Sequence, residues 1–264
     1  EIVLNETVDV NDGGVSGVML GDIIEFVPFD TPRGVEGEGV CRLSATHALN
    51  IFISVYKLST IVANKLFELM KLAREGHRIE FTIHPNEPYY TVWQIEDKIP
   101  NPPIEINIPN DSKFSEMIGN KTFGLLLMNS IPVRIPSTKV YNKYLDDFNF
   151  GPRWSGESRM MWVRPAPKTK QAGKYDSILT DEFTLGELSD EVPSILVQND
   201  IKVEYAGSAL KRESGEIVIE GVKGYGDEFM LGKRAPEDLP EEVENEVRKI
   251  VEKIDTKFKE RNIT

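Results

Sequence analysis

The residues best suited to binding chemistry are gathered in one basic, aromatic stretch, residues 149–175. It has a single acid, Glu157, against six cations: Arg153, Arg159, Arg164, Lys168, Lys170 and Lys174. The stretch therefore carries a formal charge of +5 in a chain of −12, which leaves −17 for the remainder. Charge segregated in this way predicts a contact surface.

The same stretch holds aromatic side chains and residues that break regular structure. Trp154 and Trp162 are two of the three tryptophans of the chain, and Phe150 lies close to them. The residues that disfavour a regular helix or a central strand are Pro152, Pro165, Pro167, Gly151, Gly156 and Gly173. We therefore expect an extended loop or arm.

Three interpretations of this arm remain open. In an assembly, it docks on the acidic body of a neighbouring copy, with arginines on carboxylates and tryptophans in pockets. In a single-stranded nucleic-acid binder, aromatic rings stack on bases while cations neutralise phosphates. In the third, the loop packs on its own domain. The partner-binding residues under the first two are Phe150, Arg153, Trp154, Arg159, Trp162, Arg164, Lys168 and Lys170.

We favour assembly, because the one acidic surface that certainly exists is that of the protein itself. Holding an irregular arm in one conformation costs about 1–2 kcal/mol of backbone entropy per residue, which substantial burial must offset. Two tryptophans can supply such burial. We therefore expect Trp154, Trp162 and Arg164 to lie at a contact between copies.

Catalytic and metal chemistry find less support. His47, His77 and His84 are the three histidines, and the last two lie seven residues apart on a predicted strand, which directs them to opposite faces. A zinc site needs three or four converging ligands. We expect no metal, no cofactor and no catalytic residue.

One pattern of acids and lysine is compatible with an enzyme. Glu80 lies on one predicted strand, and Glu96, Asp97 and Lys98 end the next. This resembles the acid and Glu-x-Lys set of metal-dependent nucleases, in which carboxylates hold magnesium and lysine positions water. The Pro-Asp usual in that family is absent, so the nuclease ranks third.

Composition limits the class of protein. Of 264 residues, 40% are hydrophobic, enough for a buried core, and no run of about 18 apolar residues predicts a membrane span. The N-terminus lacks the features of a signal peptide, and the single cysteine, Cys41, excludes an internal disulfide. We expect a soluble protein, intracellular or part of an assembled particle; the Glu, Lys and Ile content resembles thermophile usage.

Hydrophobic periodicity predicts the elements of the first half. A helix over 60–75 begins at Ser59 or Thr60 and ends at Gly76. Residues 48–58 alternate like a strand, although a helix beginning near Ser44 competes. Strands are expected at 15–20, 23–29, 77–84, 89–97, 124–128 and 131–135, with an edge strand or connector at 99–110.

The second half is predicted to hold a short helix over 184–196 and a hairpin of residues 201–205 and 216–220. An amphipathic helix over 240–259 has acids in its first turn and lysines in its last. The fold class expected is therefore α+β and β-rich, with mixed or antiparallel sheets and two principal helices. The expected domains are 1–148, the arm 149–175, and a small α+β region 176–264, unless one continuous domain forms.

These patterns together predict a non-enzymatic structural subunit of an oligomeric or shell-like assembly, of virion type or similar. The partner expected is another copy of the chain, and no membrane is involved. A single-stranded nucleic-acid-binding protein using the same arm is the alternative.

Overall fold

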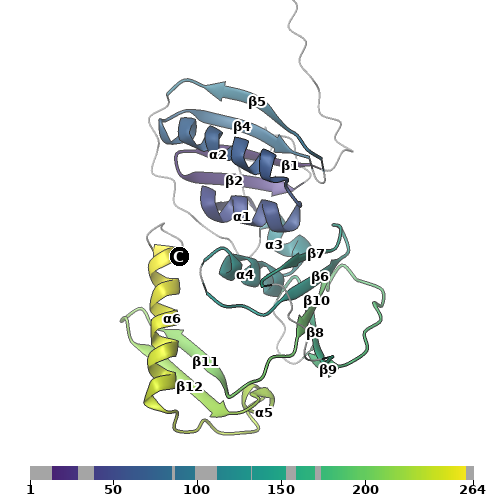
Figure 1. The fold of residues 1–264 in the computed structure, drawn as a ribbon, viewed down its shortest axis with the longest axis vertical. Coiled ribbons are helices and arrows are strands. Elements are labelled where there is room, and N and C mark those ends of the chain that lie inside the picture. Colours follow the sequence, from purple (N-terminus) through teal and green to yellow (C-terminus); the bar gives the residue numbers. More distant parts are fainter. Residues whose placement is uncertain are drawn as a thin grey trace, which may run out of the picture. The chain divides into compact units, whose positions relative to one another are not determined.

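A computed structural model describes residues 14–28, 39–84, 87–98, 112–131, 133–152, 159–169 and 174–259. The chain divides into two compact units. Unit 1 is residues 1–199 with 261–264, and unit 2 is residues 200–260. The fold is α+β and β-rich, with antiparallel sheets, as predicted (Figure 1).

The first sheet of unit 1 has the strand order β3-β2-β1-β4-β5. Its strands are β1 (Val15–Leu20), β2 (Ile23–Pro28), β3 (Cys41–Ser44), β4 (Arg78–Ile83) and β5 (Tyr90–Glu96). One face packs against helices α1 (Ala45–Val55) and α2 (Thr60–Arg74). Phe52 of α1 lies edge-on to Phe26, with ring centroids 4.8 Å apart, and also meets Phe81. These buried rings form the centre of the core.

Helix α2 confirms the prediction over 60–75, with Ser59 accepting the backbone N–H of Val62 at its start. Helix α1 shows that the strand predicted over 48–58 is wrong and that the competing helix is right. Ser44 caps α1, and the helix buries one broad face. Its apolar residues at 49, 51, 53 and 55 also alternate with polar or aromatic ones, and this alternation favoured a strand.

Two further helices follow, one where no element was predicted and one where a short strand was predicted. Helix α3 (Lys113–Ile118) and helix α4 (Asn120–Asn129) meet at Gly119, which has φ +79°. A Cβ atom at Gly119 would lie 2.2 Å from the Ala166 carbonyl oxygen, so only glycine fits this junction. The strand predicted at 124–128 is thus helix, and residues 133–135 are irregular. The prediction for 99–110 lies outside the described residues.

The second sheet of unit 1 has the order β7-β6-β10-β8-β9. Its strands are β6 (Thr138–Asn142), β7 (Phe148–Phe150), β8 (Met161–Ala166), β9 (Ile178–Thr180) and β10 (Ser194–Asn199). The helix predicted over 184–196 is wrong: the chain is irregular to Pro193 and then enters β10. Because β10 pairs with both β6 and β8, unit 1 extends to Asn199, past the boundaries expected at 148 and 175.

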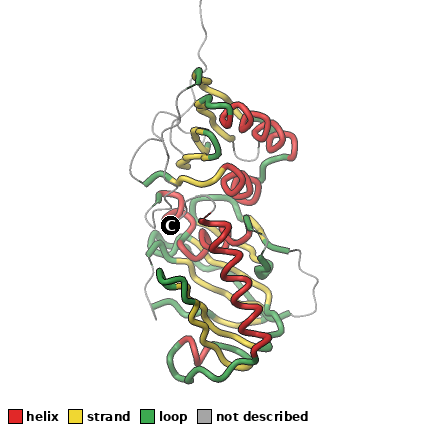
Figure 2. The backbone as a smooth tube through the Cα atoms, turned by 90° about the vertical axis from the view of Figure 1, so that its left-hand side faces the viewer, coloured by secondary structure: helices red, strands yellow, loops and turns green. Residues whose placement is uncertain are grey.

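Unit 2 is a hairpin crossed by a long helix, as Figures 1 and 2 show. Its elements are β11 (Tyr205–Lys211), β12 (Ile217–Lys223), the short α5 (Asp227–Met230) and α6 (Glu241–Lys259). Lys211 and Asp255 form an ion pair of 2.5 Å between hairpin and helix. The helix predicted over 240–259 is confirmed, and the hairpin forms with longer strands that lie further along the chain than predicted. No helix within the described ranges is long and apolar enough to span a membrane.

Candidate functional site

The basic aromatic segment is in part an interior strand. Residues 161–166 form β8, which pairs with β10 on one side and with β9 on the other. The expectation of an extended arm without a central strand is therefore wrong for these residues. The β9 pairing covers only Met161–Val163, so Pro165 lies beyond it, where its missing N–H costs no ladder bond to β9. Arg153, Trp154 and Lys170 lie outside the described residues.

The register of this sheet places three of the predicted binding residues on its inward face. Phe150 is 5% exposed and lies beside Phe148, with ring centroids 6.3 Å apart. Trp162 and Arg164 stand opposite Gln198 and Leu196, both buried, and are themselves half-buried. A buried Phe150 cannot stack on a nucleobase, so that part of the predicted interface is wrong.

Arg164 is held by neutral groups in the part of the chain that is described. Its Nη1 donates to Gln198 Oε1 at 2.9 Å, and Gln198 donates to Thr138 Oγ1 at 3.0 Å. Lys121, in the first turn of α4, donates to the Pro165 carbonyl at 2.9 Å. Burial lowers the pKa of Arg164, and burial followed by the charge of Arg164 lowers the pKa of Lys121. Burial thus disfavours the charged form of both cations, and the neighbouring charge adds to this effect at Lys121.

One further cation of the segment, Lys174, meets an acidic loop of its own chain, and the backbone of Lys168 meets the same loop. The Lys168 N–H donates to the Glu191 carbonyl at 3.0 Å, and Lys174 pairs with the Glu191 carboxylate at 3.0 Å. Hydrogen bonds from Lys174 and Tyr175 lower the pKa of Glu191. Arg159 is exposed, and Lys168 is half-buried. A contact between a cation of the segment and a carboxylate of the same chain therefore exists at Lys174, and the contact with a neighbouring copy stays a prediction.

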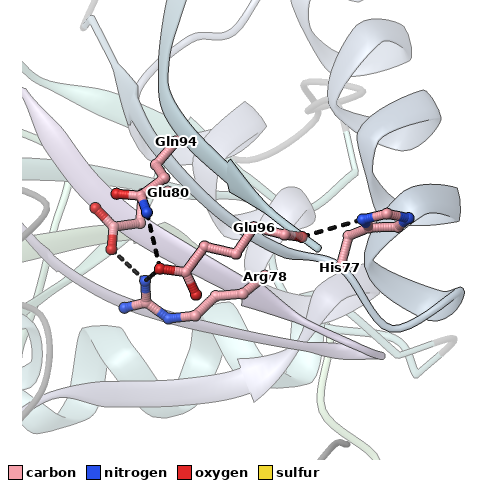
Figure 3. A network of polar contacts seen from close by, with 5 residues as sticks. All are labelled: His77, Arg78, Glu80, Gln94 and Glu96. Carbon is pink, nitrogen blue, oxygen red and sulfur yellow. Dashed lines mark hydrogen bonds and ion pairs between the residues drawn. The ribbon is translucent and has the colours of Figure 1, made fainter. Parts of the chain in front are cut away.

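Figure 3 shows the acids that suggested a nuclease, gathered around Arg78. Arg78 pairs with Glu80 and lies 3.7 Å from Glu96, which also accepts from Gln94 at 2.8 Å. Ile79 and Phe81 lie in the core, so alternation places Arg78 and Glu80 on the face opposite the helices. The sequence pattern grouped Glu80 with Glu96 but not with Arg78, because only the strand pairing places Arg78 opposite Glu96.

This arrangement favours a structural network over a metal centre. The single Arg78 guanidinium already pairs with Glu80 and lies beside Glu96, while Asp97 and Lys98 are exposed at the strand end. In the described ranges, no group of three or more His, Cys, Asp or Glu residues is placed to hold a metal ion. His77 and His84 hydrogen-bond across the β4–β5 hairpin, to the Glu96 carbonyl and the Thr91 hydroxyl, both at 3.0 Å.

Unit 2 presents a surface that sequence analysis did not single out. Its exposed apolar side chains include Leu210 (64% exposed), Met230 (68%) and Leu231 (61%). A cavity of about 140 Å³ lies between β11 and α6, lined by Tyr205, Ile219, Leu239, Val243 and Val247 together with small residues of β11. The sequence signal for this surface was the β11 segment YAGSALK, which consists mostly of small side chains and has one charged residue.

Comparisons with known proteins do not assign this site. No protein-family model matches the chain, and searches of curated proteins and of solved structures give no match. The geometry of the two units therefore carries the functional argument.

Proposed function

We propose that the protein is a non-enzymatic structural subunit that associates with further copies of itself, in an oligomeric or shell-like assembly, and that unit 2 supplies the contact. The observation that carries this proposal is the exposure of apolar side chains in unit 2. Among its described residues, Ile217 and Val222 are the only hydrophobic residues with less than a tenth of their surface exposed.

A unit built in this way gains little stability from its own core. Unit 2 spans residues 200–260, and its sheet has two strands covered by one long helix. A two-stranded ribbon is marginal in water, and a domain of about 60 residues buries a smaller share of its surface than a larger domain does. Association would remove Leu210, Met230 and Leu231 from water, at about 25 cal/mol for each Å² of apolar surface.

Light scattering across a range of protein concentrations tests the proposal directly. We expect a mass above that of the monomer, and Leu231→Ser should lower it. Leu185→Ser is the matched control, because Leu185 is also an exposed leucine, at 42%, and lies in unit 1. A strict monomer at every concentration would end the proposal, and equal losses from both variants would remove unit 2 as the contact.

Single-stranded nucleic-acid binding is kept as the second candidate because of Lys121 and Arg164. In the described part of the chain both cations hydrogen-bond neutral oxygens, which leaves their charge available to a phosphate. Binding of a labelled oligonucleotide at low salt should then weaken steeply as salt rises, and Arg164→Gln should reduce the slope by about one unit. Lack of binding at low salt removes this candidate and leaves the assembly proposal intact.

A further inference from the structure

The two edges of the unit 2 hairpin differ in how their backbone groups are used. In the β11–β12 register, Ala206 pairs with Val222, Ser208 with Glu220 and Leu210 with Val218. The ladder continues at both ends through Arg212 N–H to the Glu216 carbonyl and Gly224 N–H to the Glu204 carbonyl, each 2.8 Å. These bonds join even-numbered residues.

Antiparallel pairing alternates hydrogen-bonded and non-hydrogen-bonded pairs, so the odd-numbered residues of β11 direct their N–H and C=O groups away from β12. They are Tyr205, Gly207, Ala209 and Lys211. Within the described part of the chain, none of the four has a backbone hydrogen-bond partner on this outer side. β11 therefore presents an open edge.

Three of the four outward residues of β12 have a backbone group bonded within their own unit. The Ile217 carbonyl accepts from Arg248 at 3.2 Å, and the Gly221 carbonyl accepts from the Glu237 N–H at 2.9 Å. The Lys223 N–H donates to the Glu237 carboxylate at 3.2 Å. The contrast shows that unit 2 blocks one edge and leaves the other open.

The open edge also lacks the features that normally prevent strand addition. Natural edges are protected by proline, by bulges or by charged side chains. The register of β11 is continuous, its sequence YAGSALK contains no proline, and its one charge, Lys211, is paired with Asp255 on α6. Residues 207–210 are exposed.

We propose that β11 pairs antiparallel with β11 of a second copy, about a two-fold axis at Ser208. The inference rests on the proposed function and names its contact. Pairing must bring odd-numbered residues opposite odd-numbered residues, since only these direct their backbone N–H and C=O groups away from β12. A two-fold axis at Ser208 sets Tyr205 opposite Lys211 and Gly207 opposite Ala209, and so uses all four free residues. An axis at Gly207 or Ala209 would leave one of the end residues without a partner in β11.

The side chains fit the same axis. Ser208 meets Ser208 of the second copy, and the exposed Leu210 meets Ala206, in the close non-hydrogen-bonded pairs of such a ladder. A two-fold axis perpendicular to the sheet keeps its faces, so helix α6 of each copy lies on the same side of a four-stranded sheet. Three or more strands with a helical cover is the arrangement that gives a sheet independent stability.

Cysteine cross-linking tests the axis in the full chain. Ser208→Cys places the two introduced thiols face to face, and mild oxidation should give a disulfide-linked dimer. Ser214→Cys, in the exposed turn between β11 and β12, is the matched control and should cross-link far less. Native Cys41 is fully buried and its raised pKa keeps it protonated, so it stays unreactive. Equal cross-linking of both variants would refute the two-fold axis at Ser208. The same holds if the protein is oligomeric and Ser208→Cys gives no cross-link.

Ala209→Pro tests the hydrogen bonds themselves. Proline removes an outward N–H and leaves the β11–β12 ladder complete, because that ladder uses even residues. We expect self-association to weaken by about tenfold or more, since the substitution acts twice across the axis. Circular dichroism must show α6 retained. Unchanged association of the folded variant refutes the strand pairing while the proposed function stands, whereas a monomeric wild-type protein refutes both.

Discussion

Unit 1 and unit 2 use the same elements, antiparallel strands covered by helices, with opposite results for burial. In unit 1, Phe26, Phe52, Phe81 and Phe114 are fully buried and meet edge-to-face around α1. In unit 2, α6 covers a two-stranded ribbon that leaves most of its apolar side chains half-buried or exposed. Two sheets with interposed helices close a core, and a single hairpin does not. Unit 1 should therefore be stable by itself, while the proposed association should add stability to unit 2.

The chain carries reporters that separate the two units. All three tryptophans, Trp93, Trp154 and Trp162, belong to unit 1, as does the single cysteine. Burial raises the pKa of the Cys41 thiol, so its labelling requires unit 1 to open. Hydrogen exchange of α6 amides reports unit 2.

The largest expected difference comes from truncating one aliphatic residue in a helix of each unit. Leu66→Ala in α2 removes a fully buried side chain and should cost about 2–5 kcal/mol of unfolding free energy. Ile254→Ala in α6 removes a half-buried one and should cost about 1 kcal/mol. Denaturant unfolding followed by tryptophan fluorescence, with Cys41 labelling, measures the first, and α6 exchange measures the second. Equal costs would contradict the contrast between the cores.

Removing the cation from the polar network in Figure 3 should lower the unfolding free energy by an amount comparable to that of Leu66→Ala. Arg78→Met leaves Glu80, with a side chain 11% exposed, without its cation, and we expect a loss of about 3 kcal/mol. The double variant Arg78→Met, Glu80→Gln should recover most of this stability. If the single and double variants unfold alike, the pair contributes no coupling and the network is incidental.

The sequence predicted the elements whose signals are local. Helix α2 has the cap at Ser59 and an amphipathic stripe, and α6 has acids and lysines at its two ends. For α1, the alternation of apolar residues at 49, 51, 53 and 55 favoured a strand over the competing helix, and α4 was missed because its short apolar run at 124–128 was taken for a buried strand. Strand β8 was missed because Pro165 indicated a break, and only the end of the β9 pairing at Val163 shows why a proline is tolerated there.

The candidate site could be predicted even less, because it depends on register. Whether Gly207 and Ala209 point toward β12 or away from it follows from the pairing Ser208–Glu220, and no composition or spacing encodes that choice. The basic segment was visible as charge, yet its acidic partner Glu191 lies in a loop predicted as helix. Local patterns thus identified charged and apolar groups but not their partners.

Unit 2 should respond to protein concentration, whereas unit 1 should not. If copies associate through unit 2, each tenfold rise in concentration adds about 1.4 kcal/mol to the stability of the associated state. Hydrogen exchange of α6 should therefore slow with concentration, while the tryptophan-monitored transition of unit 1 stays fixed. Parallel behaviour of both signals would show that the two units unfold together and that the comparison does not describe their stability.

The smallest effect concerns the acidic loop beside the basic segment, and it decides whether unit 1 also offers a contact. Hydrogen bonds from Lys143 (2.5 Å) and Tyr144 (2.6 Å) lower the pKa of Asp190, as Lys174 lowers that of Glu191. A carboxylate with a depressed pKa stabilises the folded state fully at pH values above its ordinary pKa. This stabilisation is lost as the pH falls through the lowered pKa. Because these groups are exposed, global stability should hardly change.

The measurable consequence is local. Carboxyl titration by NMR should give pKa values for Asp190 and Glu191 below those of ordinary aspartate and glutamate. Asp190→Asn should speed the hydrogen exchange of backbone amides in residues 181–193 without changing the unfolding midpoint. Added salt should weaken the effect, because the pairs are screened. Ordinary pKa values at both positions would mean that Lys143 and Lys174 are not committed to their own chain. The basic segment would then be free to reach the carboxylates of a neighbouring copy, and assembly through unit 1 would have to be weighed against assembly through β11.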